Sequence, residues 1–396
     1  MSRFSRRSLF QGLASVGAGA LAAKVGLWPR TAFAQAGGEK PALLVVFLQG
    51  GYNALFSSAN SFATAGTFGV TGSNQRDLGN GLVVDAPTFG TMPAFALSHM
   101  ATVGVRHGIS NHGAAQNAVM SDGTRSYALR LAAELGGDAS IKCAQVGTRG
   151  VPGPKPMESG VSLQVITDMR STIEALGGST DTTRPDRAVS EKALQAAQLM
   201  SASTLFTSPE RTRELGEGYE AAIETLQQPV KAFNFADLAT AYGLANNATA
   251  VNGFRAQMAA AELMITAGTN VVVAMDGGWD THGDRTGANV RNMMTQRILP
   301  GLNTFLSRMV NAPGRNVVVA IVGDFARSLP GSDHASALSA TVIGKYVKVG
   351  TSGRMNDRVQ LAAGTPTAPG LWSYLGRVLN APSTPFGANP HGALVL

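Results

Sequence analysis

The chain has 396 residues, of which 44% are hydrophobic and 14% charged, a composition typical of a packed globular protein and not of a disordered one. The formal net charge is +7, but five basic residues without acidic neighbours precede residue 35: Arg3, Arg6, Arg7, Lys24 and Arg30. The rest of the chain is therefore near +2 and has no basic run, which argues against nucleic-acid binding. The single cysteine, Cys143, excludes an intrachain disulfide and a thiolate metal cluster.

The first predicted element is an export signal over residues 1–34. Arg6–Arg7 and Leu9–Phe10 form a twin-arginine pattern, a weakly apolar Gly/Ala stretch follows, and Ala32–Ala34 has the small-residue spacing that a signal peptidase needs. We therefore expect the twin-arginine translocase as a partner during export, a mature chain that begins near Gln35, and a periplasmic or secreted protein. No later apolar run is long enough to predict a stable membrane span.

Beyond the signal, short apolar and β-branched runs predict buried strands at residues 42–48, 101–106, 162–166, 270–275, 316–322 and 340–349. Helical patterns lie between them, at residues 118–135, 188–201, 209–226, 235–244, 253–267, 290–310 and 370–379. This alternation predicts one α/β domain over residues 35–396, a three-layer sandwich with a mostly parallel central sheet. The stretch 188–267 has no strand signal and predicts a helical insertion packed on the sheet.

Polar sequences follow four of the predicted strands, at the sheet edge where open α/β sheets bind ligands. Four of the six histidines lie in these loops: His107, His112, His282 and His334. Carboxylates share the loops with them, at positions 276, 280 and 333. Imidazoles and carboxylates together suit Zn²⁺, Mn²⁺ or a similar cation. The predicted metal ligands are Asp276, Asp280, His282, Asp333 and His334. The alternative is that these acids cap turns and the histidines bond to loop carbonyls.

Several of these loops carry motifs that resemble the exported family called domain of unknown function 1501. They are GGYNAL at 50–55, DGGWDTH at 276–282, GDFARS at 323–328 and SDH at 332–334. The Asp333–His334 pair also resembles a metal motif of the alkaline phosphatase-like superfamily. The resemblance implies an alkaline phosphatase-like fold with a two-metal centre that hydrolyses phosphate or sulfate esters. It implies one cation held by Asp276 or Asp280 with His282, and another held by Asp333 and His334. His391 stands where many superfamily members have a late ligand, but we expect it to be a surface histidine near the C-terminus.

The sequence departs from this family pattern in the first half of the site. Asn53 stands where the family has an acidic ligand, and an amide oxygen can still bind a hard ion but adds no negative charge. Asn111, His112 and Gly113 stand where the family has the loop that would carry a nucleophilic hydroxyl. Ser110 and Ser121 are the candidate hydroxyl nucleophiles, and the alternative is that each is a turn or helix-cap serine. The candidates to clamp an anionic ester are Arg106, Arg125 and Arg327, and the alternative is that these arginines are solvated or paired. We expect a divalent cation (Zn²⁺, Mn²⁺, Mg²⁺ or Ca²⁺) at one or two positions, and one ion rather than two.

Two classes of function stay open at this point. The first is a metal-dependent hydrolase of phosphate or sulfate esters, acting on an anionic small molecule at a partly degenerate site. The second is a non-catalytic binding or assembly protein of the periplasm that keeps the same fold. The paired acids and histidines favour the first class, and the amides at positions 53 and 111 favour the second.

Overall fold

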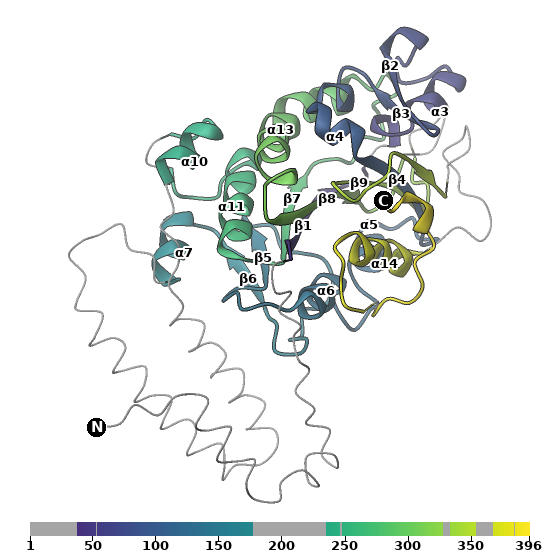
Figure 1. Ribbon diagram of the computed structural model, residues 1–396. Coiled ribbons are helices and arrows are strands. Elements are labelled where there is room, and N and C mark those ends of the chain that lie inside the picture. The colour runs from purple at the N-terminus through teal and green to yellow at the C-terminus, as the bar shows by residue number, and fades with distance from the viewer. Residues whose placement is uncertain are drawn as a thin grey trace, which may run out of the picture. The chain divides into compact units, whose positions relative to one another are not determined.

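The computed structural model of the protein describes residues 38–52, 54–176, 235–245, 248–327, 333–353, 367–383 and 385–396 (Figure 1). The chain divides into two compact units, Met1–Gly38 and Glu39–Leu396, and the second contains the whole sheet. The predicted signal over residues 1–34 lies outside the described residues, as do the helices expected at 188–201 and 209–226. Among the described helices, none is both long and apolar enough to cross a membrane.

Eight strands form one sheet in the order β10-β4-β9-β8-β1-β7-β5-β6. Their bounds are β1 Lys40–Gln49, β4 Met100–Arg106, β5 Cys143–Val146, β6 Leu163–Ile166, β7 Val271–Gly277, β8 Arg315–Gly323, β9 Ala337–Gly344 and β10 Gly350–Ser352. All run parallel except β9, which is antiparallel to β4 and β8. A separate hairpin consists of β2 (Gln75–Gly79) and β3 (Leu82–Asp85).

The centre of the sheet is β1, which pairs in parallel with β7 on one side and β8 on the other. Both of its faces are buried, which explains its unbroken apolar sequence. Alternate side chains divide between two cores, so that Leu44, Val46 and Leu48 enter one core while Leu43, Val45 and Phe47 enter the other. The predicted mostly parallel sheet is confirmed.

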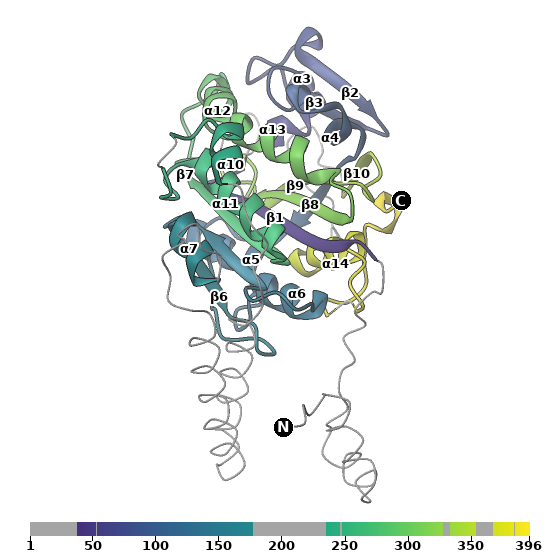
Figure 2. The ribbon, with the colours of Figure 1, turned by 60° about the vertical axis from the view of Figure 1, so that its left-hand side comes forward.

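Helices cover both faces of the sheet (Figure 1, Figure 2). Helices α11 and α13 pack in the first core, and α5, α6 and α14 pack in the second. The α-helices are α3 Ala59–Thr64, α4 Ala94–Ser98, α5 His112–Met120, α6 Tyr127–Leu135, α7 Met169–Ala175, α10 Phe235–Ala241, α11 Phe254–Ala267, α12 Ala288–Met293, α13 Leu299–Phe305 and α14 Ala368–Val378. Two π-helical segments, Met294–Ile298 and Leu306–Val310, continue α12 and α13. The three-layer α/β sandwich is therefore as expected.

The structure corrects several predicted elements. The single helix expected over 118–135 is two helices, because α5 ends at Met120 and the next residue, Ser121, donates its hydroxyl to the Asn117 carbonyl at 2.9 Å. The strand expected at 340–349 is β9 at Ala337–Gly344, followed by the short β10. Helix α11, the last part of the helical stretch that was expected to pack on the sheet, lies against β7 and β5.

The strand directions decide where the polar loops lie. Because β1, β4, β7 and β8 are parallel, their carboxyl ends reach the same edge of the sheet. The antiparallel β9 brings its amino end, and with it Asp333 and His334, to that edge. All four predicted loops thus share one edge, as the sequence indicated.

Candidate metal centre

The loop after β1 and the loop after β7 touch each other at the floor of the site. Gly50 has φ +114°, and a Cβ atom there would lie 2.4 Å from the backbone nitrogen of Asp280. Only glycine permits this close approach. The Trp279 amide also donates to the Gln49 carbonyl at 3.1 Å, so the two loops are held together before any side chain of the site is considered.

Three imidazoles meet at this edge, and each has its Nδ1 atom engaged by an oxygen. His112 Nδ1 lies 2.6 Å from Asp324 Oδ2, His334 Nδ1 lies 2.5 Å from the Ser110 carbonyl oxygen, and His282 Nδ1 pairs with Asp280 Oδ1. An oxygen acceptor at Nδ1 holds the proton there and leaves the Nε2 lone pair for another partner. All three rings are therefore set to present Nε2.

The Nε2 atoms of His112 and His334 are buried and have no hydrogen-bond partner within the described ranges. His112, Asp280 and His334 each offer a ligand atom, and these three atoms lie within 4.8 Å of one another. His282, Asp333 and His334 form a second such triplet, and the two triplets share His334. Two imidazole nitrogens with one carboxylate oxygen are a donor set that suits Zn²⁺ and similar divalent cations, so the residues fit the expected metal.

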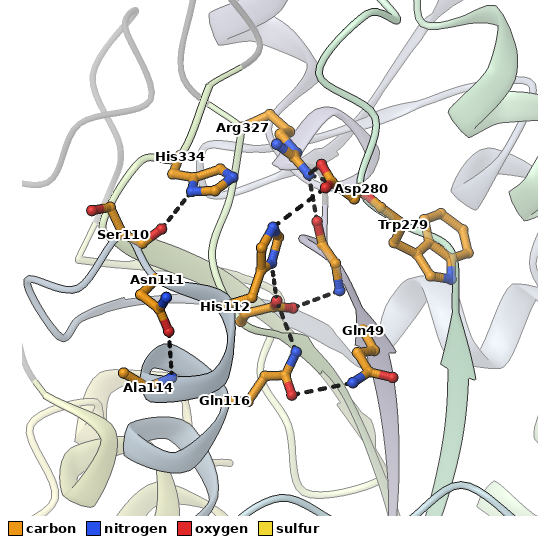
Figure 3. A network of polar contacts seen from close by, with 12 residues as sticks. Gln49, Ser110, Asn111, His112, Ala114, Gln116, Trp279, Asp280, Arg327 and His334 are labelled. Atoms are coloured by element: carbon orange, nitrogen blue, oxygen red, sulfur yellow. Dashed lines mark hydrogen bonds and ion pairs between the residues drawn. The ribbon is translucent and has the colours of Figure 1, made fainter.

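A buried polar chain stands behind His112 (Figure 3). Asp324 is fully buried and accepts hydrogen bonds from the Gly50 amide at 2.9 Å and from Gln116 Nε2 at 3.2 Å, in addition to its contact with His112. Gln116 in turn accepts from Gln49 Nε2 at 3.2 Å. Carboxylates that hold a ligating histidine in this way fix the orientation of its ring.

Asp280 is placed between two kinds of partner. Its Oδ1 atom accepts from Arg327 Nη2 at 2.8 Å and contacts His282, whereas its Oδ2 atom faces His112 Nε2 at 3.5 Å. Burial alone would raise the pKa of Asp280, but the hydrogen bonds and charges of Arg327 and His282 outweigh burial and lower it. Asp280 is therefore a carboxylate at neutral pH, with one oxygen directed at the imidazoles.

Phe325 forms the apolar wall of the site. It is fully buried, its ring stacks on His334 at a centroid distance of 4.1 Å, and it lies 4.7 Å from the His112 ring. Burial is the main cause that lowers the pKa of His334, and the nearby His112, Arg327 and His282 lower it further, against the opposing hydrogen bond to Ser110. His334 is thus neutral at physiological pH, the form that can ligate a metal.

The structure does not bring Asp276 into either triplet, although the sequence predicted it as a ligand. Asp276 Oδ2 accepts from Trp279 Nε1 at 2.8 Å and from Arg297 Nη2 at 2.5 Å. Arg297 also donates to the Gly277 carbonyl at 2.8 Å. Through these contacts Asp276 fixes the conformation of the loop that carries Asp280 and His282.

The residues expected to act on a substrate have structural contacts of their own. Asn111 is the N-cap of α5 and accepts from the Ala114 amide at 3.1 Å. Figure 3 shows the Ser110 hydroxyl directed away from the imidazoles. Arg327, expected to clamp an ester, is fully buried and donates to the Gly50 carbonyl and to Asp280. Asn53 lies outside the described residues.

His391 lies apart from both triplets. Its Nδ1 atom lies 2.8 Å from the Ser352 hydroxyl, and its ring packs edge-on against Tyr374. His391 is therefore not a ligand in either triplet, and the surface position expected for it is wrong, because its side chain is buried. Asp324 and Gln116 support the site but were not among its predicted residues. An acid directly after the buried run of β8 was the available signal for Asp324, and the sequence gives none for Gln116.

Comparison with known proteins finds one matching family and one similar solved structure. The model of the family described as "Protein of unknown function (DUF1501)" matches residues 163–368, just over half of the chain. Among solved structures, alkaline phosphatase from the Antarctic bacterium TAB5 is similar at 8% identity and a TM-score of 0.35, with 87% of this chain and 100% of that chain covered. No curated protein matches the sequence.

Proposed function

Because the chain belongs to the DUF1501 family, whose description assigns no chemistry, we propose its function from the site itself. We propose that it binds one divalent cation through His112, Asp280 and His334 and hydrolyses phosphate or sulfate esters there, with slow turnover of generic aryl esters. The observation that carries the proposal is the pair of buried Nε2 atoms, of His112 and His334, which lack hydrogen-bond partners among the described residues and face a carboxylate.

An unsatisfied buried nitrogen costs about 1–3 kcal/mol, and two of them side by side are hard to explain as a purely structural feature. A cation would accept both lone pairs and would be neutralised in part by Asp280. When bound, such an ion supplies Lewis acidity toward an ester oxygen and lowers the pKa of a water molecule.

The chain's own residues have distinct tasks in this proposal. Asp324 keeps the proton of His112 on Nδ1, Arg327 holds one oxygen of Asp280, and Phe325 excludes water from one side of the imidazoles. Since the Ser110 hydroxyl points away and Asn111 has none, we assign the attack on the ester to a water molecule and not to a protein hydroxyl.

Metal content and ester hydrolysis of the purified protein test the proposal together. We expect about one ion per chain by elemental analysis, and slow hydrolysis of 4-nitrophenyl phosphate or sulfate. His334→Ala should lose both, whereas His99→Ala, a histidine beside Phe95 and away from the site, should lose neither. Protein that takes up no divalent ion even when dialysed against Zn²⁺ or Mn²⁺ would overturn the proposal.

A second function, non-catalytic ligand binding, is favoured by one observation. The Asn111 amide is used as a helix cap, so the loop that carries a nucleophile in the family resemblance has a structural task instead. Under this alternative the same protein binds the ion but hydrolyses neither ester. The metal and activity measurements therefore separate the two functions.

We also propose that the protein is exported by the twin-arginine pathway, on the strength of the Arg6–Arg7 pattern and the cleavage spacing at residues 32–34. Replacement of both arginines by lysine should keep the uncleaved precursor in the cytoplasm. A double variant that is cleaved and exported as well as the parent would refute this pathway.

A further inference from the structure

We propose that His282 and Asp333 form an outer, transient position through which the cation reaches and leaves the inner position at His112 and Asp280, with His334 shared by both. This inference rests on the proposed metal site. It concerns the route of the ion and not the chemistry that the ion supports.

The shared residue limits how the two positions can be used. His334 Nδ1 is engaged by the Ser110 carbonyl, so only its Nε2 atom can ligate a cation. The inner triplet and the outer triplet both need that one atom. A single imidazole nitrogen has one lone pair and binds one ion at a time. The two triplets are therefore alternative positions for a single ion.

The inner position has the stronger support and is where the ion rests. His112 is held by the fully buried Asp324, and Asp280 is held by the fully buried Arg327. Metal ligands that are held in place by a second residue bind the ion more tightly than unsupported ligands, by roughly 10–100-fold in affinity.

The outer position is open to solvent. The Asp333 side chain is 77% exposed and that of His282 is 47% exposed, and Asp333 Oδ1 lies 3.6 Å from His282 Nε2. His282 Nδ1 is engaged by Asp280, so its Nε2 atom faces Asp333. Asp280 therefore touches both groups, with Oδ2 toward the inner imidazole and the other oxygen toward the outer one. An ion that exchanges its water ligands one at a time can pass from Asp333 and His282 to His112 and Asp280 without leaving His334.

The test compares rates with equilibrium. Association of Co²⁺ is followed by stopped-flow absorbance and dissociation by chelator competition, in the parent protein and in His282→Gln and Asp333→Asn. A residue that acts only on the route changes entry and exit equally, so we expect both rates to fall about tenfold while the equilibrium Kd changes less than about twofold. Asp138→Asn, which removes an exposed charge elsewhere, controls for charge steering and should change neither rate.

Three outcomes would overturn the outer position. Unchanged rates would show that the ion enters elsewhere. A faster exit with a weaker Kd would make His282 and Asp333 permanent ligands. If only the association rate of Asp333→Asn fell, and added salt removed the difference from the parent, Asp333 would act only by attracting the cation through its charge. Each leaves the inner site standing if the parent protein holds one ion, and loss of that ion in His112→Ala tests the inner site separately.

Discussion

Two polar clusters of this protein differ in whether their buried groups have hydrogen-bond partners. In the first, the buried Glu262 of α11 accepts Arg308 Nε and Nη2 on its two oxygens at 2.8–3.0 Å and also accepts the Tyr242 hydroxyl at 2.8 Å. In the second, at the carboxyl edge of the sheet, the buried Nε2 atoms of His107, His112 and His334 remain without hydrogen-bond partners in the described residues, and His112 and His334 lie in a triplet with a carboxylate. A satisfied network stabilises the fold, whereas an unsatisfied one marks a place for a ligand.

The largest effect should come from breaking the satisfied network. Arg308→Met leaves the Glu262 carboxylate buried with only the tyrosine hydroxyl, so the free energy of unfolding should fall by about 3 kcal/mol. Urea denaturation followed by circular dichroism measures this. Arg106→Met, at the exposed end of β4, is the matched control and should stay within about 0.5 kcal/mol. An equal fall in the free energy of unfolding of the two variants would mean that the network contributes no more to stability than an exposed arginine does.

In the unsatisfied cluster, the residue behind the ligand should matter next. Asp324→Asn keeps the shape but weakens the hold on the His112 proton, so metal affinity should fall about 10–100-fold, or about 1.4–2.7 kcal/mol. Isothermal titration with Zn²⁺ measures the change. Asp276→Asn tests the same substitution on an acid outside the triplets and should leave the affinity within about twofold. A larger loss in Asp276→Asn would restore Asp276 as a ligand.

A histidine away from this edge sharpens the comparison, because His391 also has an unpartnered Nε2 among the described residues but lies in neither metal triplet. Burial lowers its pKa from 6.5 to about 4. The imidazole of His391 therefore binds a proton more tightly in the unfolded chain than in the folded one. As a result, its contribution to the free energy of unfolding is largest above pH 6.5 and is lost as the pH falls toward 4. Relative to His391→Gln, the parent protein should lose about 1–2 kcal/mol between pH 7.5 and 5. Parallel stability curves for parent and variant would contradict this assignment.

The smallest effect should come from the loop residue that the fold uses as a cap. Asn111→Ala removes the hydrogen bond to the Ala114 amide and should cost about 1 kcal/mol of stability, while Asn111→Ser, an equally good cap, should be near neutral. Chemical denaturation of both variants checks the difference. Metal stoichiometry should be the same in both, and a loss of the ion in Asn111→Ser would show that the amide is a ligand.

The fold was largely readable from the sequence because its central strands are unbroken apolar runs that end at glycine and acid residues. Strand β5 was missed because its sequence CAQV has one β-branched residue, whereas β6, which is equally short, has two in LQVI. The Gln145 side chain of β5 bonds to the Gly147 carbonyl and the Val151 amide. The break between α5 and α6 was missed because it depends on a serine bonding back to a carbonyl, a contact with no apolar pattern.

The site was readable in part, for a physical reason. The histidines and acids of the loops were found by their residue types. Their division into ligands and supports depends on partners far along the chain, such as Asp324, 212 residues after His112. Asp276 and Asp280 are alike in sequence, and only Arg297 and Trp279 on one side and Arg327 on the other decide which faces the imidazoles.

The connection between β8 and β9 is pinned at both of its ends. The Ala326 amide donates to the Ala337 carbonyl at 2.6 Å, the Ala335 amide donates to the Ala326 carbonyl at 3.0 Å, and Arg327 and His334 face each other as a β-bridge. The position of His334 is therefore set by this ribbon. An imidazole held in this way can move only together with the ends of β8 and β9, so the geometry of the ion site is tied to the pairing of these two strands.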